Sequence, residues 1–133
     1  MAEEKRTGNT VNEIYQTALC LMYENTKNTK DYDPYLFSVI NVLLAENYEL
    51  NNTYREAYGI KPLDAMPYVT EKSDTVPYEP VFCRQIIPYG MASHFFVDDS
   101  MNKHADFYAL YNNARVDAER AVITSYPAED EEE

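Results

Sequence analysis

The sequence predicts an all-α fold: a four-helix bundle-like subunit with a long extended arm between its second and third helices and a short C-terminal tail. Apolar residues recur every three or four positions in four separate stretches, which is the spacing of a buried helix face. Residues 60–80, between the second and third stretches, have no such period and contain several prolines. We expect a flexible lead at residues 1–9, one helical domain at 10–126 and an acidic tail at 127–133.

The first predicted helix begins at Thr10. Thr10 and Glu13 have the spacing of a capping box, in which the hydroxyl and the carboxylate each accept a hydrogen bond from the other residue's free backbone amide. The apolar stripe that follows consists of Val11, Ile14, Tyr15, Ala18, Leu19 and Met22. This pattern is typical of a helix with one buried face.

The second predicted helix begins at Asp33 and Pro34, because aspartate caps helix starts and a proline in the first turn leaves no amide unpaired. Its apolar stripe consists of Leu36, Phe37, Ile40, Leu43, Leu44 and Tyr48. The helix is expected to run to Tyr58, where Gly59 ends it.

Two interpretations of residues 60–80 stay open. The segment is either a mobile surface loop or an arm that becomes ordered when an adjacent subunit or partner covers it. In the second case, short strands around Tyr68 and Thr75 would pair across chains. Because the apolar stripes lie elsewhere, deletion of residues 62–79 is expected to leave the helical core folded.

The third predicted helix contains Pro88, which either opens it or kinks it after a preceding turn. Its inward residues are Ile87, Met91, Phe95 and Phe96. A short turn at Asp98, Asp99 and Ser100 makes the third and fourth helices antiparallel neighbours.

The fourth predicted helix is long and apolar on more than one side. Its main stripe is Phe107, Leu110, Tyr111, Ala114, Ala118, Ala121 and Val122, and it is widened by Met101, Ala105 and Tyr108. Residues 122–126 either fray from the helix or form a short strand.

The net charge of −12 argues against nucleic-acid and anionic-membrane binding, since no basic cluster offers contacts to phosphate. No apolar run approaches the roughly 18 residues of a spanning helix, and no signal peptide is visible. Cys20 and Cys83 lie in apolar segments without metal-ligand spacing, so we expect buried, reduced thiols and no disulfide. These features predict a soluble protein made in a reducing compartment, with no membrane contact.

No catalytic constellation is visible, so the sequence predicts no enzyme, cofactor or metal site. With three glycines there is no phosphate-binding loop. His94, Asp98, Asp99 and His104 are the one candidate metal cluster, but we favour a core histidine at His94 and capping roles for the aspartates. Thirteen tyrosines exceed what one core of this size needs and suit subunit contacts.

Several segments resemble the head-tail adaptor, or connector, proteins of tailed bacteriophages. The resemblance covers roughly residues 11 to 120 and consists of patterns of residue type. Its strongest part is a proline-tyrosine-glycine helix, an acidic turn and a long aromatic helix. The segments that carry it are residues 13–22, 36–44, 54–60, 87–92, 95–99, 105–108 and 111–114.

The resemblance implies a ring, usually of twelve copies, that docks on the portal protein and extends the DNA channel toward the tail. Such a subunit is assembled in the host cytoplasm, resides in the virion neck, and also contacts further neck or tail-completion proteins. DNA would pass through the lumen without specific binding, because an acidic wall repels it. The implied ring and portal contacts are Tyr68, Val69, Thr70, Thr75, Val76, Tyr78, Val122, Ile123 and Tyr126.

Three alternatives remain. The chain could be an acidic DNA mimic that inhibits a host nucleic-acid enzyme, with carboxylates spaced along one face. It could be a small metal-dependent hydrolase that uses His94 and His104. It could also be a helical subunit of an unrelated bacterial complex.

Overall fold

The computed structural model describes residues 8–23 and 30–125, and these form four α-helices without a β-strand. The all-α class is therefore confirmed for this part of the chain. The helices are α1 (Val11–Leu21), α2 (Leu36–Ala57), α3 (Ile87–Phe95) and α4 (Met101–Ser125). The predicted lead and tail lie outside the described residues, apart from Gly8 and Asn9.

Helix α1 begins as its sequence predicts. The Glu13 amide donates to Thr10 Oγ1 at 3.1 Å, and the Thr10 amide donates to Glu13 Oε1 at 3.2 Å. The stripe from Val11 to Met22 is buried in the core. Local capping and an apolar face therefore determine this helix together.

Helix α2 begins three residues later than predicted. Asp33, Pro34 and Tyr35 form a separate 3-10 turn, and no side chain caps the start of α2. The Asp33 carboxylate instead accepts a hydrogen bond from the Tyr15 hydroxyl at 2.8 Å, which connects this turn to α1. At the other end, Gly59 has φ +77°, a conformation that favours glycine and ends the helix.

A single π-helical turn, Phe82–Ile86, precedes α3 and places Pro88 in the first turn of that helix. A proline there leaves no amide unpaired, and the π-turn lets the chain enter α3 without a clash. Gly90 lies where α2, α3 and α4 meet, since an added Cβ would be 2.7 Å from Leu43 Cδ2 and 3.1 Å from the Tyr111 ring. Helix α3 is thus the centre of the packing.

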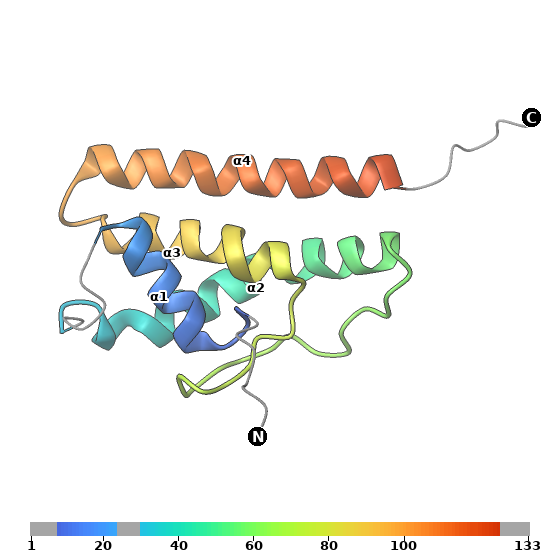
Figure 1. Cartoon of the computed structure of the whole chain (residues 1–133), viewed down its shortest axis with the longest axis horizontal. Coiled ribbons are helices and arrows are strands. Elements are labelled where there is room, and N and C mark those ends of the chain that lie inside the picture. Colours follow the sequence, from blue (N-terminus) through green and yellow to red (C-terminus); the bar gives the residue numbers. More distant parts are fainter. Residues whose placement is uncertain (1–7, 24–29, 126–133) are drawn as a thin grey trace, which may run out of the picture.

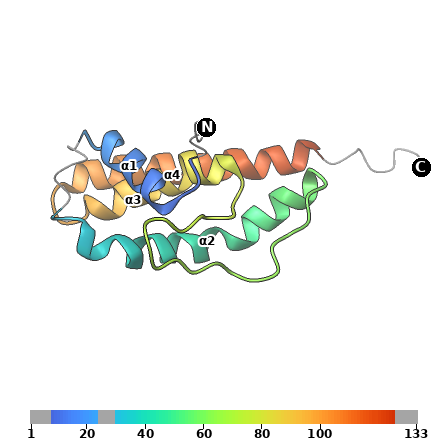
Figure 2. The same cartoon turned by 60° about the horizontal axis from the view of Figure 1, so that its bottom comes forward.

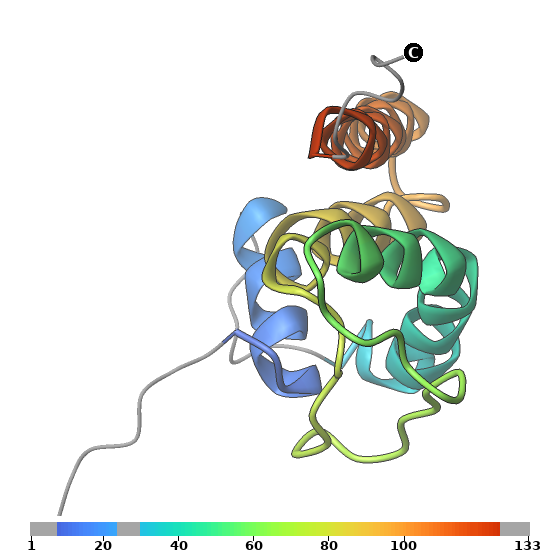
Figure 3. The same ribbon diagram turned by 90° about the vertical axis from the view of Figure 1, so that its right-hand side faces the viewer.

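Helices α3 and α4 run antiparallel, and α4 covers one side of the other helices (Figures 1 and 3). Its C-terminal half extends past α3 and lies over the C-terminal half of α2. Helix α4 is continuous through Ser125, so residues 122–125 are helical and the predicted fraying or strand at that point is wrong. None of the helices in the described ranges is long and apolar enough to span a membrane.

The 60–80 segment runs back along α2 and packs on its own chain (Figure 2). Val69, Val76 and Tyr78 are buried in the core, and the Tyr78 hydroxyl donates to the Leu44 carbonyl. Its one β-bridge joins Thr75 to Thr10 of the same chain. In this structure the segment is therefore ordered by its own chain, and the strand pairing expected across chains occurs within one.

Three asparagines of α2 hold the 60–80 segment. The Asn41 side chain forms hydrogen bonds with the backbone amide and carbonyl of Val69, both at 2.9 Å. The Asn52 side chain accepts from the backbone amide of Leu63 at 2.8 Å and donates to its carbonyl at 3.4 Å. Asn51 Oδ1 accepts from the Glu79 amide at 2.9 Å. These side chains give hydrogen-bond partners to backbone amides and carbonyls of the segment, which in a β-strand would be paired with a neighbouring strand.

Candidate functional site

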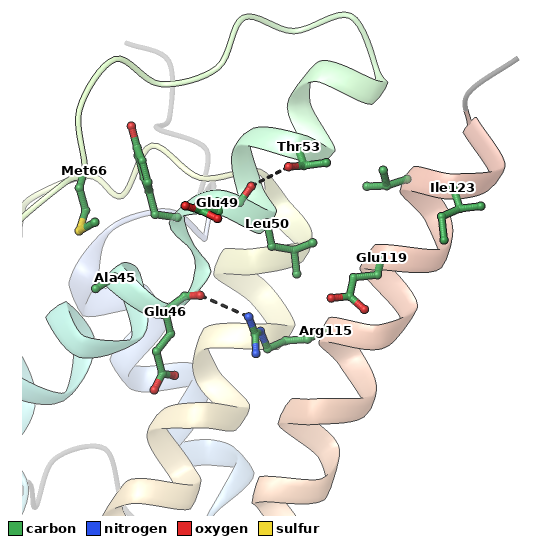
Figure 4. Close-up of a pocket in the computed structure, with 11 residues that line it drawn as sticks. Ala45, Glu46, Glu49, Leu50, Thr53, Met66, Arg115, Glu119 and Ile123 are labelled. Atoms are coloured by element: carbon green, nitrogen blue, oxygen red, sulfur yellow. Dashed lines mark hydrogen bonds between the residues drawn. The ribbon is translucent and has the colours of Figure 1, made fainter.

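The main hollow of interest is an open groove between the C-terminal halves of α2 and α4, which we name the α2–α4 groove (Figure 4). Its volume is about 630 Å³. It is lined by Ala45, Glu46, Tyr48, Glu49, Leu50, Thr53, Met66, Arg115, Glu119, Val122 and Ile123. Two helices and the 60–80 segment therefore contribute to one surface.

The apolar part of the α2–α4 groove is open to water. Leu50 and Val122 pack toward the core, whereas Met66 and Ile123 are 52% and 71% exposed. Met66 projects from the 60–80 segment and Ile123 from α4 (Figure 4). Exposed apolar side chains around a concave surface are a feature of sites that bind another protein segment.

The polar part of the α2–α4 groove is acidic. Glu46, Glu49 and Glu119 carry three carboxylates, and Arg115 is the one cation among the lining residues. Arg115 is held inward, because its Nε donates to Asn47 Oδ1 at 2.9 Å and an Nη donates to the Glu46 carbonyl at 3.3 Å. The rim therefore presents more negative than positive charge to an incoming partner.

A buried polar network fixes α4 against α2 at the inner end of the α2–α4 groove. Asn47 is fully buried, and its Nδ2 donates to the Tyr111 hydroxyl at 3.0 Å and to the Leu43 carbonyl at 2.9 Å. The Tyr111 hydroxyl donates to Glu46 Oε1 at 2.6 Å. Burial raises the pKa of Tyr111, and its hydrogen bond to Glu46 raises it further, so the hydroxyl stays protonated and can donate.

The predicted contact residues fall into four groups. Val122 and Ile123 line the α2–α4 groove, so the structure places them at a candidate binding surface. Tyr68 is 76% exposed, and Thr70 and Thr75 are also exposed, but these three lie outside the groove.

The remaining predicted contacts do not lie on the described surface. Val69, Val76 and Tyr78 are buried by their own chain, which corrects their assignment as residues that reach another subunit. The reason is the anchoring of the 60–80 segment on α2, which the apolar stripes do not reveal. Tyr126 lies outside the described residues.

The core position predicted for His94 is wrong. His94 is exposed, and it is Ser93 that is buried. His104 Nδ1 lies 2.8 Å from the Ser93 carbonyl and 3.1 Å from Ser93 Oγ. The start of α4 is capped by Ser100, whose Oγ accepts from the Lys103 amide at 3.2 Å.

Asp98 and Asp99 are exposed, and the capping roles predicted for them are wrong, because Ser100 fills that position. Residues 8–23 and 30–125 contain no group of three or more histidine, cysteine or carboxylate side chains placed to hold a metal ion.

Both cysteines are free thiols, but only one is buried. Burial raises the pKa of Cys83 to about 12. Cys20 is exposed, which corrects the expectation that both thiols are buried. It faces outward because α1 uses Ala18 and Leu19 for its contacts.

Most of the site residues that the sequence does not reveal are polar. Asn47 and Asn51 continue the buried stripe of α2 at helical spacing, and a polar residue on such a stripe is a signal for a buried hydrogen-bond network. Glu46, Met66 and Arg115 gave no comparable signal, because their proximity depends on how α2, α4 and the 60–80 segment meet.

Comparison with protein-family models, with curated proteins and with solved structures found no match.

Proposed function

We propose that this protein is a structural subunit of a phage head-tail connector ring, which docks on the portal protein and extends the DNA channel toward the tail. The observation that carries the proposal is the α2–α4 groove, an open apolar surface with an acidic rim. The resemblance to head-tail adaptors supplies the identity of the assembly. The groove supplies a place where a neighbouring protein would bind.

The chemistry of the α2–α4 groove favours a protein segment over a small substrate. The groove is open along its length and has apolar side chains from both helices, which suits an amphipathic segment laid between them. Glu49 and Glu119 on its rim favour a segment with lysine or arginine beside its apolar residues. The portal or an adjacent subunit would provide that segment.

The net charge of −12 supports passage of DNA through such a ring. A lumen lined by carboxylates repels the duplex at short range, while counterions limit the barrier at longer range. The protein is therefore expected to bind duplex DNA weakly at physiological salt. Tight binding in an electrophoretic mobility assay at that salt would contradict this part of the proposal.

The decisive experiment measures the mass of the purified protein alone and mixed with the portal protein of the same virus. A closed ring or a stoichiometric complex with portal is the expected result. A complex with a basic host enzyme and none with portal would instead support the DNA-mimic alternative. Absence of any portal complex would refute the connector assignment.

A matched pair of variants tests the α2–α4 groove itself. Met66→Asp removes an apolar wall and adds a carboxylate to an acidic rim, so it is expected to weaken portal binding at least tenfold. Ala65→Asp places the same charge on the adjacent exposed residue, which does not line the groove. Equal portal affinity for the two variants would show that the groove is not the docking site.

A further inference from the structure

A second hollow continues the α2–α4 groove toward the start of α4. It lies where α2, α3 and α4 meet, has a volume of about 360 Å³, and is named the three-helix hollow. Glu46 of α2 and Arg115 of α4 line both this hollow and the groove, so the two are neighbours along one seam between the helices. Arg115 reaches across that seam to Glu46 and lies between them (Figure 4).

The residues that α4 contributes to the two hollows share one flank of the helix. Tyr108 and Asn112 line the three-helix hollow, and Glu119 and Ile123 line the α2–α4 groove. Tyr108 and Glu119 are 11 residues apart, as are Asn112 and Ile123, and 11 residues return to the same side of a straight helix. The two parts of the α4 wall are therefore about 16 Å apart, at 1.5 Å per residue, and face the same side of the protein.

That spacing suits a helical occupant better than an extended one. Two side chains of a helix that are 11 residues apart also lie about 16 Å apart on one face, so each can enter one hollow. An extended segment covers 16 Å in about five residues, and side chains five residues apart point to opposite faces. The lining residues of α4 run from His104 to Ile123, so a helix of about 20 residues would fill the whole seam.

The charges along the seam indicate what such a helix carries. Glu46, Glu49 and Glu119 place carboxylates on both walls, so the helix needs lysine or arginine beside its apolar face. Arg115 uses its Nε and one Nη within its own chain, and its other Nη makes no hydrogen bond to the described residues. A glutamine or a carboxylate near the middle of the helix could accept from that Nη.

We propose that the seam binds a basic amphipathic helix of a different protein, which lies across the α2–α4 groove and the three-helix hollow together. A helix of a second copy fits the seam poorly, because none of the described α-helices has more lysine and arginine than aspartate and glutamate. The inference rests on the proposed function, under which the different protein is the portal. It narrows that function, because the portal and not an adjacent subunit supplies the helix.

Asn112→Lys and Asn113→Lys form a matched pair of variants. Asn112 lines the three-helix hollow, whereas the adjacent Asn113 is exposed and lines neither hollow. Both variants gain the same charge, so non-specific attraction of a basic partner changes equally in the two. A lysine at position 112 repels and obstructs the incoming helix and should weaken its binding about tenfold relative to a lysine at position 113.

The first probe is a fluorescein-labelled peptide of leucine and lysine, about 20 residues long, with its leucines on one helical face. Fluorescence anisotropy should show about tenfold weaker binding to Asn112→Lys than to Asn113→Lys. A peptide with a central proline, which breaks the helix, should bind the native protein about tenfold more weakly than the parent peptide, and this comparison does not depend on how the variants fold. Equal affinities in either comparison would overturn the inference.

Portal protein is the second probe, and it separates this inference from the connector assignment. The expected result is weaker portal binding by Asn112→Lys than by Asn113→Lys. A native protein that binds portal, with equal portal affinities for the two variants, keeps the proposed function and loses the helix in the seam. A native protein that ignores portal, while the two variants still differ toward the peptide, loses the proposed function and keeps the seam as a site for a basic helix.

Discussion

Val76→Ala tests whether the 60–80 segment folds on its own chain. Val76 is completely buried, and its amide donates to the Asn9 carbonyl at 2.7 Å. The substitution removes two methyl groups, worth about 1.6 kcal/mol at roughly 0.8 kcal/mol per buried carbon, and the cavity left behind brings the loss to about 2–3 kcal/mol. This is a large part of the roughly 5–15 kcal/mol that stabilises a typical domain.

The assay is urea unfolding followed by far-ultraviolet circular dichroism, at several protein concentrations. Thr75→Ala is the matched control, because Thr75 is adjacent and exposed, and its loss should stay within about 0.5 kcal/mol. Equal unfolding free energies for the two variants would show that Val76 is not packed in this core. A loss for Val76→Ala that depends on protein concentration would show that a second chain supplies the packing.

Deletion of residues 62–79 is expected to unfold the helical core, contrary to the expectation from the apolar stripes alone. The deletion removes Val69, Val76 and Tyr78 from the core and leaves Asn41 and Asn52 without their backbone partners. The deleted protein is therefore expected to be largely unfolded. A cooperative unfolding transition with native helix content would contradict this.

Three further changes probe the contacts among the helices. Gly90→Ala pushes a methyl group against Leu43 and should cost about 1–3 kcal/mol, seen as a lower urea midpoint. Asn47→Ala should cost about 2 kcal/mol and should be less than additive with Arg115→Ala, because the two side chains share a hydrogen bond. Cys83 has its pKa raised from 9.0 to about 12, so its contribution to stability is complete below pH 9 and is lost as the pH rises toward 12. The contribution of Cys83 to the unfolding free energy should fall by about 1.4 kcal/mol per pH unit in that range. Cys83→Ala should flatten the fall between pH 9 and 10, where the tyrosines contribute least.

Local signals in the sequence predict the helices well and the connections poorly. Helix α1 matches its prediction because the capping box of Thr10 and Glu13 and the apolar stripe both act within a few residues. Helix α2 begins three residues after its predicted start, because the Asp33 carboxylate bonds Tyr15, which is distant in sequence, and does not cap the helix. The anchoring of the 60–80 segment likewise depends on Asn41 and Asn52, whose partners are 28 and 11 residues away.

The candidate site could be predicted only in part for the same reason. Val122 and Ile123 are apolar residues near the end of a helix, and they do line the α2–α4 groove. The groove also needs Met66 and the acidic residues of α2, and their meeting depends on α4 extending past α3. The spacing of apolar residues identifies the buried face of each helix. A groove forms only where two such helices meet, and the spacing does not determine the angle at which they meet.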